Sequence, residues 1–220
     1  MWIHFIHRKQ RIAVASGFTL IEMLVALSIF IILSSAFLMN YNTFNKRISL
    51  DTLAHQIGQW VRDAQVSAMS VKNSKTQAGT FPGYGLHFDI ATPDRFVYFA
   101  DLNNNKRYDP PISPAKCGDP GVECEREILL LQGNSIVSLC GLVTPPTIPT
   151  ITPKCGATLS TSQTFDIVFT RPNPDADIAG DLNSVGSFPT PYSSARITVS
   201  SVTGYERVVE TWITGQISVQ

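Results

Sequence analysis

One glutamate, Glu22, stands out as a functional charge because it lies at the edge of a long apolar stretch. The 17 residues from Met23 to Met39 carry no charge, and Phe18–Ile21 extend their apolar character. A carboxylate at the edge of hydrocarbon costs roughly 2.5–3.5 kcal/mol on scales derived from membrane insertion, so it is a candidate functional residue by default. Ahead of it lies a short basic leader that ends in Ser16-Gly17.

A second group of residues has the chemistry of a metal site. Side-chain oxygens and one backbone carbonyl recur at the spacing of an EF-hand-like or dockerin-like calcium loop, at Asp101, Asn103, Asn105, Arg107 (carbonyl) and Asp109. The sequence departs from that pattern at Lys106, in place of the turn glycine, and at Ile112, in place of the bidentate glutamate. The alternative is an Asx-rich turn whose side chains bond its own backbone amides. Both interpretations stay open.

The four cysteines, Cys117, Cys124, Cys140 and Cys155, all follow the apolar stretch. An even number of cysteines outside a membrane segment predicts an oxidising compartment and one or two disulfides. Sequential pairing, Cys117–Cys124 and Cys140–Cys155, is favoured because both intervening loops are rich in proline and glycine. Free buried thiols are the alternative, and a zinc site is disfavoured because no CxxC pair or nearby histidine supports it.

No catalytic set emerges from the remaining reactive side chains. Two histidines lie in the leader, His55 lies on a predicted helix and His87 on a predicted strand. The chain has no nucleophile elbow, no Ser–His–Asp spacing and no phosphate-binding glycine loop. We therefore predict a protein that is not an enzyme and requires no cofactor, with calcium as the one candidate. Its charge is balanced at 17 basic and 17 acidic residues, which argues against a nucleic-acid partner.

The element that carries Glu22 is a predicted helix from about Phe18 to about Val71. Its first part, residues 18–39, approaches the roughly 20 apolar residues that cross a bilayer. The basic leader before it should stay cytoplasmic, which places the rest of the chain outside. Residues 40–75 are amphipathic, because apolar side chains recur there at spacings of three and four: Leu50, Leu53, Ile57, Trp60, Ala64, Ala68 and Val71.

Residues 76–220 should form a β-rich head domain of short strands divided by turn residues. The predicted strands are Tyr84–Ile90, Arg95–Asp101, Glu127–Leu131, Ser135–Cys140, Phe165–Thr170, Ala195–Val202, Glu206–Ile213 and Gln216–Val219. Three long loops separate them, Asn103–Arg126, Gly141–Ser162 and Arg171–Ser194, and loops of that length are functional or disordered. The predicted fold class is α+β: a long N-terminal helix, membrane-spanning in its first half, packed on antiparallel β-sheets.

The run Gly17-Phe18-Thr19-Leu20-Ile21-Glu22-Met23-Leu24-Val25-Ala26-Leu27 resembles the type IV prepilin (class III) signal. The resemblance is close from Gly17 to about Leu33. It implies that residues 1–17 are a leader peptide and that a membrane-embedded aspartyl prepilin peptidase cleaves after Gly17. The same enzyme methylates the new N-terminal residue, Phe18.

By this resemblance Glu22 becomes the fifth residue of the mature chain, the position that guides filament assembly in pilins. Cleavage exposes a cationic amine at Phe18 inside an apolar helix bundle, where Glu22 of an adjacent subunit can neutralise it. Breaking one partner of such a pair costs about 3–5 kcal/mol. Thr19-Leu20-Ile21-Glu22 also fits an S/T-x-x-E capping box, which means only a well-capped helix. The two interpretations are compatible.

The order of parts is similar to that of minor pilins and pseudopilins of the GspH/FimT type. This implies a structural subunit with a single span in the bacterial inner membrane and its head outside the cytoplasm. An inner-membrane assembly platform would then build it, with other pilins or pseudopilins, into a periplasmic or extracellular filament of a type IV pilus or type II secretion system. Two alternatives stay open, a major pilin of a pilus shaft and a pilin-mounted binding module for calcium, DNA or a surface ligand in adhesion or natural transformation. DNA is the weaker ligand, because only Arg207 remains of the basic motif that some DNA-binding minor pilins carry.

Overall fold

The computed structural model describes residues 17–142, 153–155, 163–181 and 190–220, without the side chains of residues 37, 39, 40, 42, 43, 153, 154, 190 and 191. Residues 1–16 of the predicted leader lie outside the described residues. The chain divides into two compact units, residues 1–42, which we call the N-terminal unit, and residues 43–220, which we call the head. One helix, α1 (Leu20–Met69), begins in the first unit and ends in the second.

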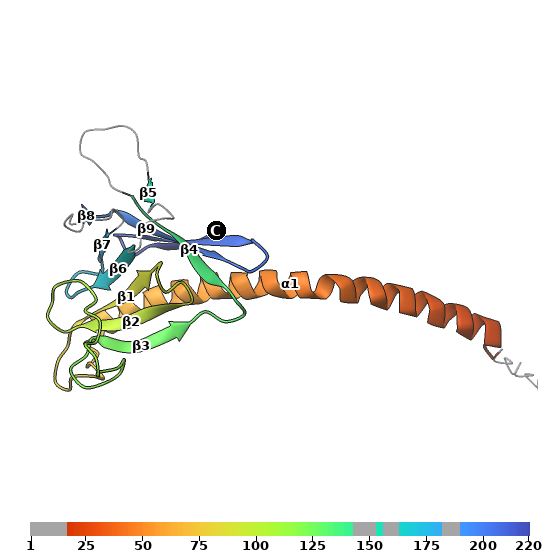
Figure 1. Ribbon diagram of the computed structural model, residues 1–220, viewed down its shortest axis with the longest axis horizontal. Helices are drawn as coiled ribbons and strands as arrows, with labels where there is room; N and C mark the ends of the chain where they lie inside the picture. Colours follow the sequence, from red (N-terminus) through yellow and green to blue (C-terminus); the bar gives the residue numbers. More distant parts are fainter. Residues whose placement is uncertain (1–16, 143–152, 156–162, 182–189) are drawn as a thin grey trace, which may run out of the picture. The chain divides into compact units, whose positions relative to one another are not determined.

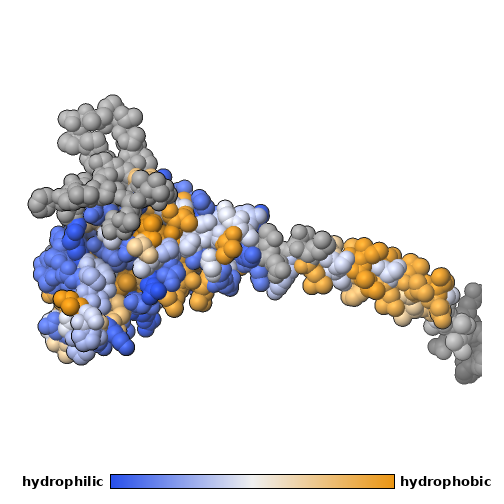
Figure 2. Space-filling model, viewed as in Figure 1, coloured by the Kyte–Doolittle hydropathy of each residue, from blue (hydrophilic) through white to orange (hydrophobic). Residues whose placement is uncertain are grey.

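The N-terminal unit exposes its apolar side chains on every side of α1. From Leu20 to Leu38, every described side chain except that of Ser34 is exposed, and Figure 2 shows hydrophobic residues gathered along this part of the helix. Within the described residues, no helix combines the length and the apolar character that a membrane span needs. The predicted span over residues 18–39 is therefore not confirmed, and two of its members, Phe37 and Met39, have side chains outside the description.

The head contains two antiparallel sheets (Figure 1). Sheet A has the strand order β3-β2-β1-β6-β7-β8, and its strands are β1 (Gly83–Asp89), β2 (Arg95–Asp101), β3 (Cys124–Leu129), β6 (Thr164–Phe169), β7 (Ala176–Asp181) and β8 (Thr190–Pro191). Sheet B has the order β11-β10-β9-β4-β5, and its strands are β4 (Ser135–Leu142), β5 (Pro153–Cys155), β9 (Ser194–Ser200), β10 (Glu206–Trp212) and β11 (Ile217–Val219). Each predicted strand is present, with ends shifted by a few residues.

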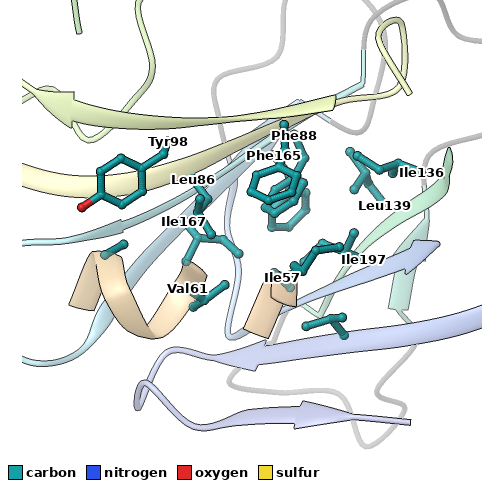
Figure 3. Packing of buried hydrophobic residues seen from close by; sticks show 14 of the residues in the cluster. Ile57, Val61, Leu86, Phe88, Tyr98, Ile136, Leu139, Phe165, Ile167 and Ile197 are labelled. Atoms are coloured by element: carbon teal, nitrogen blue, oxygen red, sulfur yellow. The ribbon is translucent and has the colours of Figure 1, made fainter. Parts of the chain in front are cut away.

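The core of the head forms where α1 meets both sheets (Figure 3). The predicted helical stripe is buried at Leu50, Ile57 and Ala64, each at most 1% exposed, but its last predicted member, Val71, lies beyond the end of α1 and is 50% exposed. Alternate residues of the strands face it, because successive side chains of a strand point to opposite sides of the sheet. Those labelled in Figure 3 are Leu86, Phe88, Tyr98, Phe165 and Ile167 from sheet A, and Ile136, Leu139 and Ile197 from sheet B.

The outer face of sheet A is also covered, by the loop between β2 and β3. Val97, Phe99, Val168 and Cys124 form a second buried cluster on this side, against which Tyr108, Cys117 and Val122 of the loop pack. At Gly85 on β1, an added Cβ would lie 2.9 Å from the Phe99 ring and 2.7 Å from the Ile167 carbonyl oxygen. The sheet therefore has apolar packing on both faces, and the loop is part of the fold.

Candidate processing and assembly segment

The predicted cleavage site lies in an accessible, non-helical stretch just before α1. Gly17, Phe18 and Thr19 precede the first helical residue, Leu20. The Phe18 side chain is 78% exposed, and a Cβ placed on Gly17 would meet no atom within 4 Å. A peptidase must bind the chain in an extended form around the bond that it cuts. The Gly17–Phe18 bond lies before the helix and is exposed, so it is accessible to such an enzyme.

Thr19 caps the start of α1. The Glu22 amide donates to Thr19 Oγ1 at 3.3 Å, and the Met23 amide donates to the Thr19 carbonyl at 3.1 Å. The Thr19 hydroxyl thus satisfies the Glu22 amide, which the first helical turn would leave unpaired, and the Thr19 carbonyl accepts the first intrahelical hydrogen bond. Among the described residues, the Glu22 carboxylate has no ion-pair partner, and it sits at the positive end of the helix dipole. The cap explains how the helix begins and leaves this carboxylate available to another charge.

Two of the three serines in the apolar segment bond within the helix. Ser28 Oγ donates to the Val25 carbonyl at 2.7 Å, and Ser35 Oγ donates to the Ile32 carbonyl at 2.8 Å. Serine hydroxyls that bond back to the preceding turn need no outside partner. Glu22 is the one charged residue between positions 18 and 45 of the sequence. Glu22 is therefore the one charged side chain that this segment can offer to a partner.

Residues 13–38 match the family model of the prokaryotic N-terminal methylation motif. This match supports a type IV pilin-like prepilin signal in the chain. The long N-terminal helix followed by antiparallel sheets has the layout of a pilin-like fold, so the predicted α+β class is confirmed. No curated protein and no solved structure matches the chain.

The predicted metal-binding loop folds as a set of Asx turns. Asp101 accepts the amides of Asn105 and Lys106, one on each carboxylate oxygen, at 3.0 and 2.9 Å. Asn103 Oδ1 also accepts the Asn105 amide, and Asn105 Oδ1 accepts the Arg107 amide. These are the backbone bonds that the Asx-turn alternative predicts. No group of three or more His, Cys, Asp or Glu side chains is arranged to hold a metal ion in the described part of the chain.

Calcium binding by this loop remains a prediction. The side-chain Nδ2 atoms of Asn103 and Asn105 both donate to Asp109 Oδ2, at 2.6 and 3.0 Å. The residues of the proposed ligand set therefore lie together. If calcium binds there, it stabilises the folded protein by mass action and raises the melting temperature relative to EGTA. Asp109→Asn should remove this response. Equal melting temperatures in calcium and in EGTA would leave the Asx turns as the whole role of these residues.

Glu123 is a residue of this loop that the sequence pattern did not indicate. Its Oε1 accepts the Leu102 amide at 3.1 Å and its Oε2 accepts the Asp109 amide at 2.8 Å. The side chain is only 6% exposed. Glu123, immediately before β3, thus binds the backbone at both ends of the 101–109 turn. The pattern missed it because it follows Asp109 by 14 residues, far outside the calcium-loop spacing.

Glu123 should make stability fall as the pH rises. Burial raises the pKa of its carboxyl group, against the two amide bonds that lower it, and nearby Asp109 and Asp101 raise it further. The folded state therefore binds more protons than the unfolded state. The resulting stability is fully present below the unfolded pKa and is lost as the pH rises through the folded pKa. Glu123→Gln removes this titration but leaves one amide facing an NH₂ group, at a cost of about 1–3 kcal/mol.

Denaturant unfolding of the wild type and Glu123→Gln from pH 4 to 7 checks this expectation. The unfolding free energy of the wild type should decline more steeply with pH than that of the variant. If the unfolding free energies of the two proteins changed with pH in parallel, Glu123 would have the same pKa in the folded and the unfolded state. Burial also raises the pKa of Asp101, so some decline should persist in the variant.

The cysteines form two disulfides, Cys117–Cys124 and Cys140–Cys155. These are the bridges of the sequential pairing. The first closes the β2–β3 loop beside the outer face of sheet A, and the second joins β4 to β5 at directly paired positions. Both lie in the head, at a distance in sequence from the processing segment.

His87 lies beside a carboxylate within the outer face of sheet A. Its Nδ1 is 2.6 Å from Asp166 Oδ1 on the neighbouring strand β6, and the Tyr108 ring packs against the imidazole at a tilt of 42°, with centroids 4.7 Å apart. This contact attaches the end of the 101–109 turn to the sheet. Burial raises the pKa of Tyr108 to about 12. The tyrosine thus stays neutral in this packing over the physiological pH range.

Proposed function

We propose that this protein is a minor pilin or pseudopilin, a structural subunit of a type IV pilus or type II secretion filament. The observation that carries the proposal is the methylation motif over residues 13–38, read together with the accessible Gly17–Phe18 bond. The processed chain begins at Phe18 and enters the filament through the apolar part of α1. Before assembly the chain is held in the inner membrane by that segment.

Two features favour a minor subunit over the major pilin of a shaft. The β2–β3 loop is long and fixed to the sheet by packing and a disulfide, so it presents a defined surface. Its Ile112 side chain is 87% exposed. A subunit at a tip needs such a surface for recognition more than it needs lateral repetition. Partners in this proposal are prepilin peptidase, other pilins and the assembly platform.

The N-terminus of the mature protein tests the proposal. In cells with prepilin peptidase, intact-mass and N-terminal analysis should give a chain that starts Phe18-Thr19-Leu20 with a methylated amine. In cells without the peptidase, the mass should include the leader. A Met1 start in cells with the peptidase, or a cut at another bond, would remove the proposed function.

A further inference from the structure

Two β-turns of the head lie beside α1 at the same level of the helix. The β3–β4 turn is joined to α1 by Asn134, whose Nδ2 donates to Ser49 Oγ at 3.2 Å. The β9–β10 turn is joined to α1 by Arg47, whose guanidinium lies 3.9 Å from the centre of the Tyr205 ring. Figure 1 shows both turns beside the helix at one end of the sheets. They therefore belong to one surface of the head.

Each of these turns carries an exposed apolar side chain. Leu131 is 72% exposed and Val202 is 70% exposed, at positions where turns normally hold Gly, Pro, Asn, Asp or Ser. Both turns are closed by backbone hydrogen bonds, from the Asn134 amide to the Leu131 carbonyl at 3.3 Å and from the Gly204 amide to the Ser201 carbonyl at 2.9 Å. The two apolar side chains are thus held out on fixed backbone.

The helix continues this apolar surface. Ile48 and Leu131 line one hollow of about 290 Å³, and Phe44 is exposed one helical turn before Ile48, on the same face of α1. Val202 lies against the β3–β4 turn, because a Cβ on Gly133 would be 2.6 Å from it. We call Phe44, Ile48, Leu131 and Val202 the turn surface. A contiguous exposed apolar surface of this kind marks an interaction site.

The charges along α1 beside the turn surface are basic. Between positions 23 and 50 of the sequence, the charged residues are Lys46 and Arg47. Asp51, the acidic residue that follows them, forms an ion pair with Arg207. Apolar side chains with adjoining cations are the composition that binds a membrane surface, because the apolar groups enter the acyl boundary and the cations attract anionic lipid phosphates. An apolar protein partner would gain nothing from the two cations.

The position of these residues along α1 fits the edge of a bilayer. Roughly 20 helical residues cross the hydrocarbon core, so a crossing counted from Met23 ends near position 42. The headgroup layer beyond it is roughly 5–8 Å thick. Phe44 and Ile48 follow position 42 within roughly 3–9 Å of helical rise. When the apolar segment is in the bilayer, the helical part of the turn surface thus comes level with the lipid headgroups.

We propose that the turn surface lies in the headgroup layer of the membrane before the subunit is assembled, with Lys46 beside the lipid phosphates. The inference rests on the proposed function, in which α1 is held in the inner membrane, and adds a second, peripheral contact by the head. This contact fixes which side of the head faces the bilayer. The β-turns act as two apolar tips on either side of the helix that enters the membrane.

Spin labels on the full chain test the contact. The four native cysteines are all in disulfides, so Leu131→Cys, Val202→Cys and Ile112→Cys can each be labelled at one thiol. The protein is reconstituted at high lipid excess in vesicles of phosphatidylethanolamine and phosphatidylglycerol. The ratio of accessibility to oxygen, which concentrates in lipid, over a nickel chelate, which stays in water, should be severalfold higher at the two turn positions than at Ile112. Equal ratios at the three positions would overturn the proposal.

A charge in the turn surface gives a second readout. Val202→Asp places a good turn former in the β9–β10 turn, so the head should fold. With the label at Leu131, this variant should lower the oxygen-to-nickel ratio to the value found at Ile112, because the aspartate is repelled by the anionic lipid. Ser113→Asp, an exposed residue of the β2–β3 loop, is the matched control and should leave the ratio unchanged. An equal effect of both variants, or of neither, would contradict the contact.

A label at Ile29→Cys separates this proposal from the proposed function. Ile29 is an exposed residue of the apolar segment and should be accessible to oxygen alone. Access of nickel to Ile29 would remove the membrane-held subunit and the contact with it. Oxygen access at Ile29 with nickel access at Leu131 and Val202 would overturn the contact alone. Exclusion of both reagents from the turn positions would also overturn it, because a second copy of the chain would then cover them.

Discussion

Gly17→Val should leave the leader on the chain. The residue before the cut has no side chain, and nothing lies within 4 Å of the position that a Cβ would take, so the substitution is tolerated by the protein itself. The branched side chain instead meets the peptidase, whose site accepts glycine before the scissile bond in the prepilin signals that this segment resembles. We expect processing to fall at least tenfold, which corresponds to about 1.4 kcal/mol of lost transition-state stabilisation.

Intact-mass analysis of the membrane fraction measures this effect, since uncut and cut chains differ by the whole leader. Ser16→Ala, at the adjacent position, is the matched control and should be cut normally. Full processing of Gly17→Val at the Gly17–Phe18 bond would contradict recognition of the glycine.

Glu22→Gln should be processed but should fail to enter filaments. The substitution keeps the shape and removes the charge, while the Thr19 cap uses only the backbone amide of residue 22 and therefore survives. In the filament the new amine of Phe18 would then be buried without its partner. Loss of one member of a buried pair costs about 3–5 kcal/mol, which is a factor on the order of 100 to 1,000 in docking.

Separate measurements of leader removal and of subunit recovery in sheared filaments isolate this effect. Glu22→Asp retains the charge and should recover part of the incorporation. Ser28→Ala removes only a hydroxyl that bonds within the helix, so it should assemble as the wild type does. Normal recovery of Glu22→Gln would show that a cap is the whole role of this segment.

The helix and most strands were predictable because their signals are local. The apolar period of three and four along residues 50–68 directly sets the face of α1 that is buried. Strand β7 (Ala176–Asp181) was missed although alternate residues are buried, because two of its three buried positions, Ala176 and Gly180, hold small residues and only Ile178 is a typical strand former. Gly180 lies so close to Phe165 that a Cβ would be 2.8 Å from its ring. The bulky Phe165 on the neighbouring strand leaves room only for glycine at this position. A requirement set by a neighbouring strand cannot be read from the local sequence.

The candidate site likewise has one part that the sequence predicts and another that it does not. Gly17, Phe18 and Glu22 are close in sequence, so their spacing alone indicates the processing segment. The role of Glu123 depends on contacts across the fold, as does the contact of the β3–β4 turn with α1 through Asn134 and Ser49. Contacts between residues so far apart in the sequence produce no periodic pattern in it.

The β2–β3 loop is attached to the sheet at its two ends and remains open at its middle. Tyr108 and Glu123 hold it, while Ile112 between them stands 87% exposed. Sequence inserted beside Ile112 should thus be displayed without unfolding the head. An epitope tag or a fluorophore placed there would report the position of each subunit in a living cell.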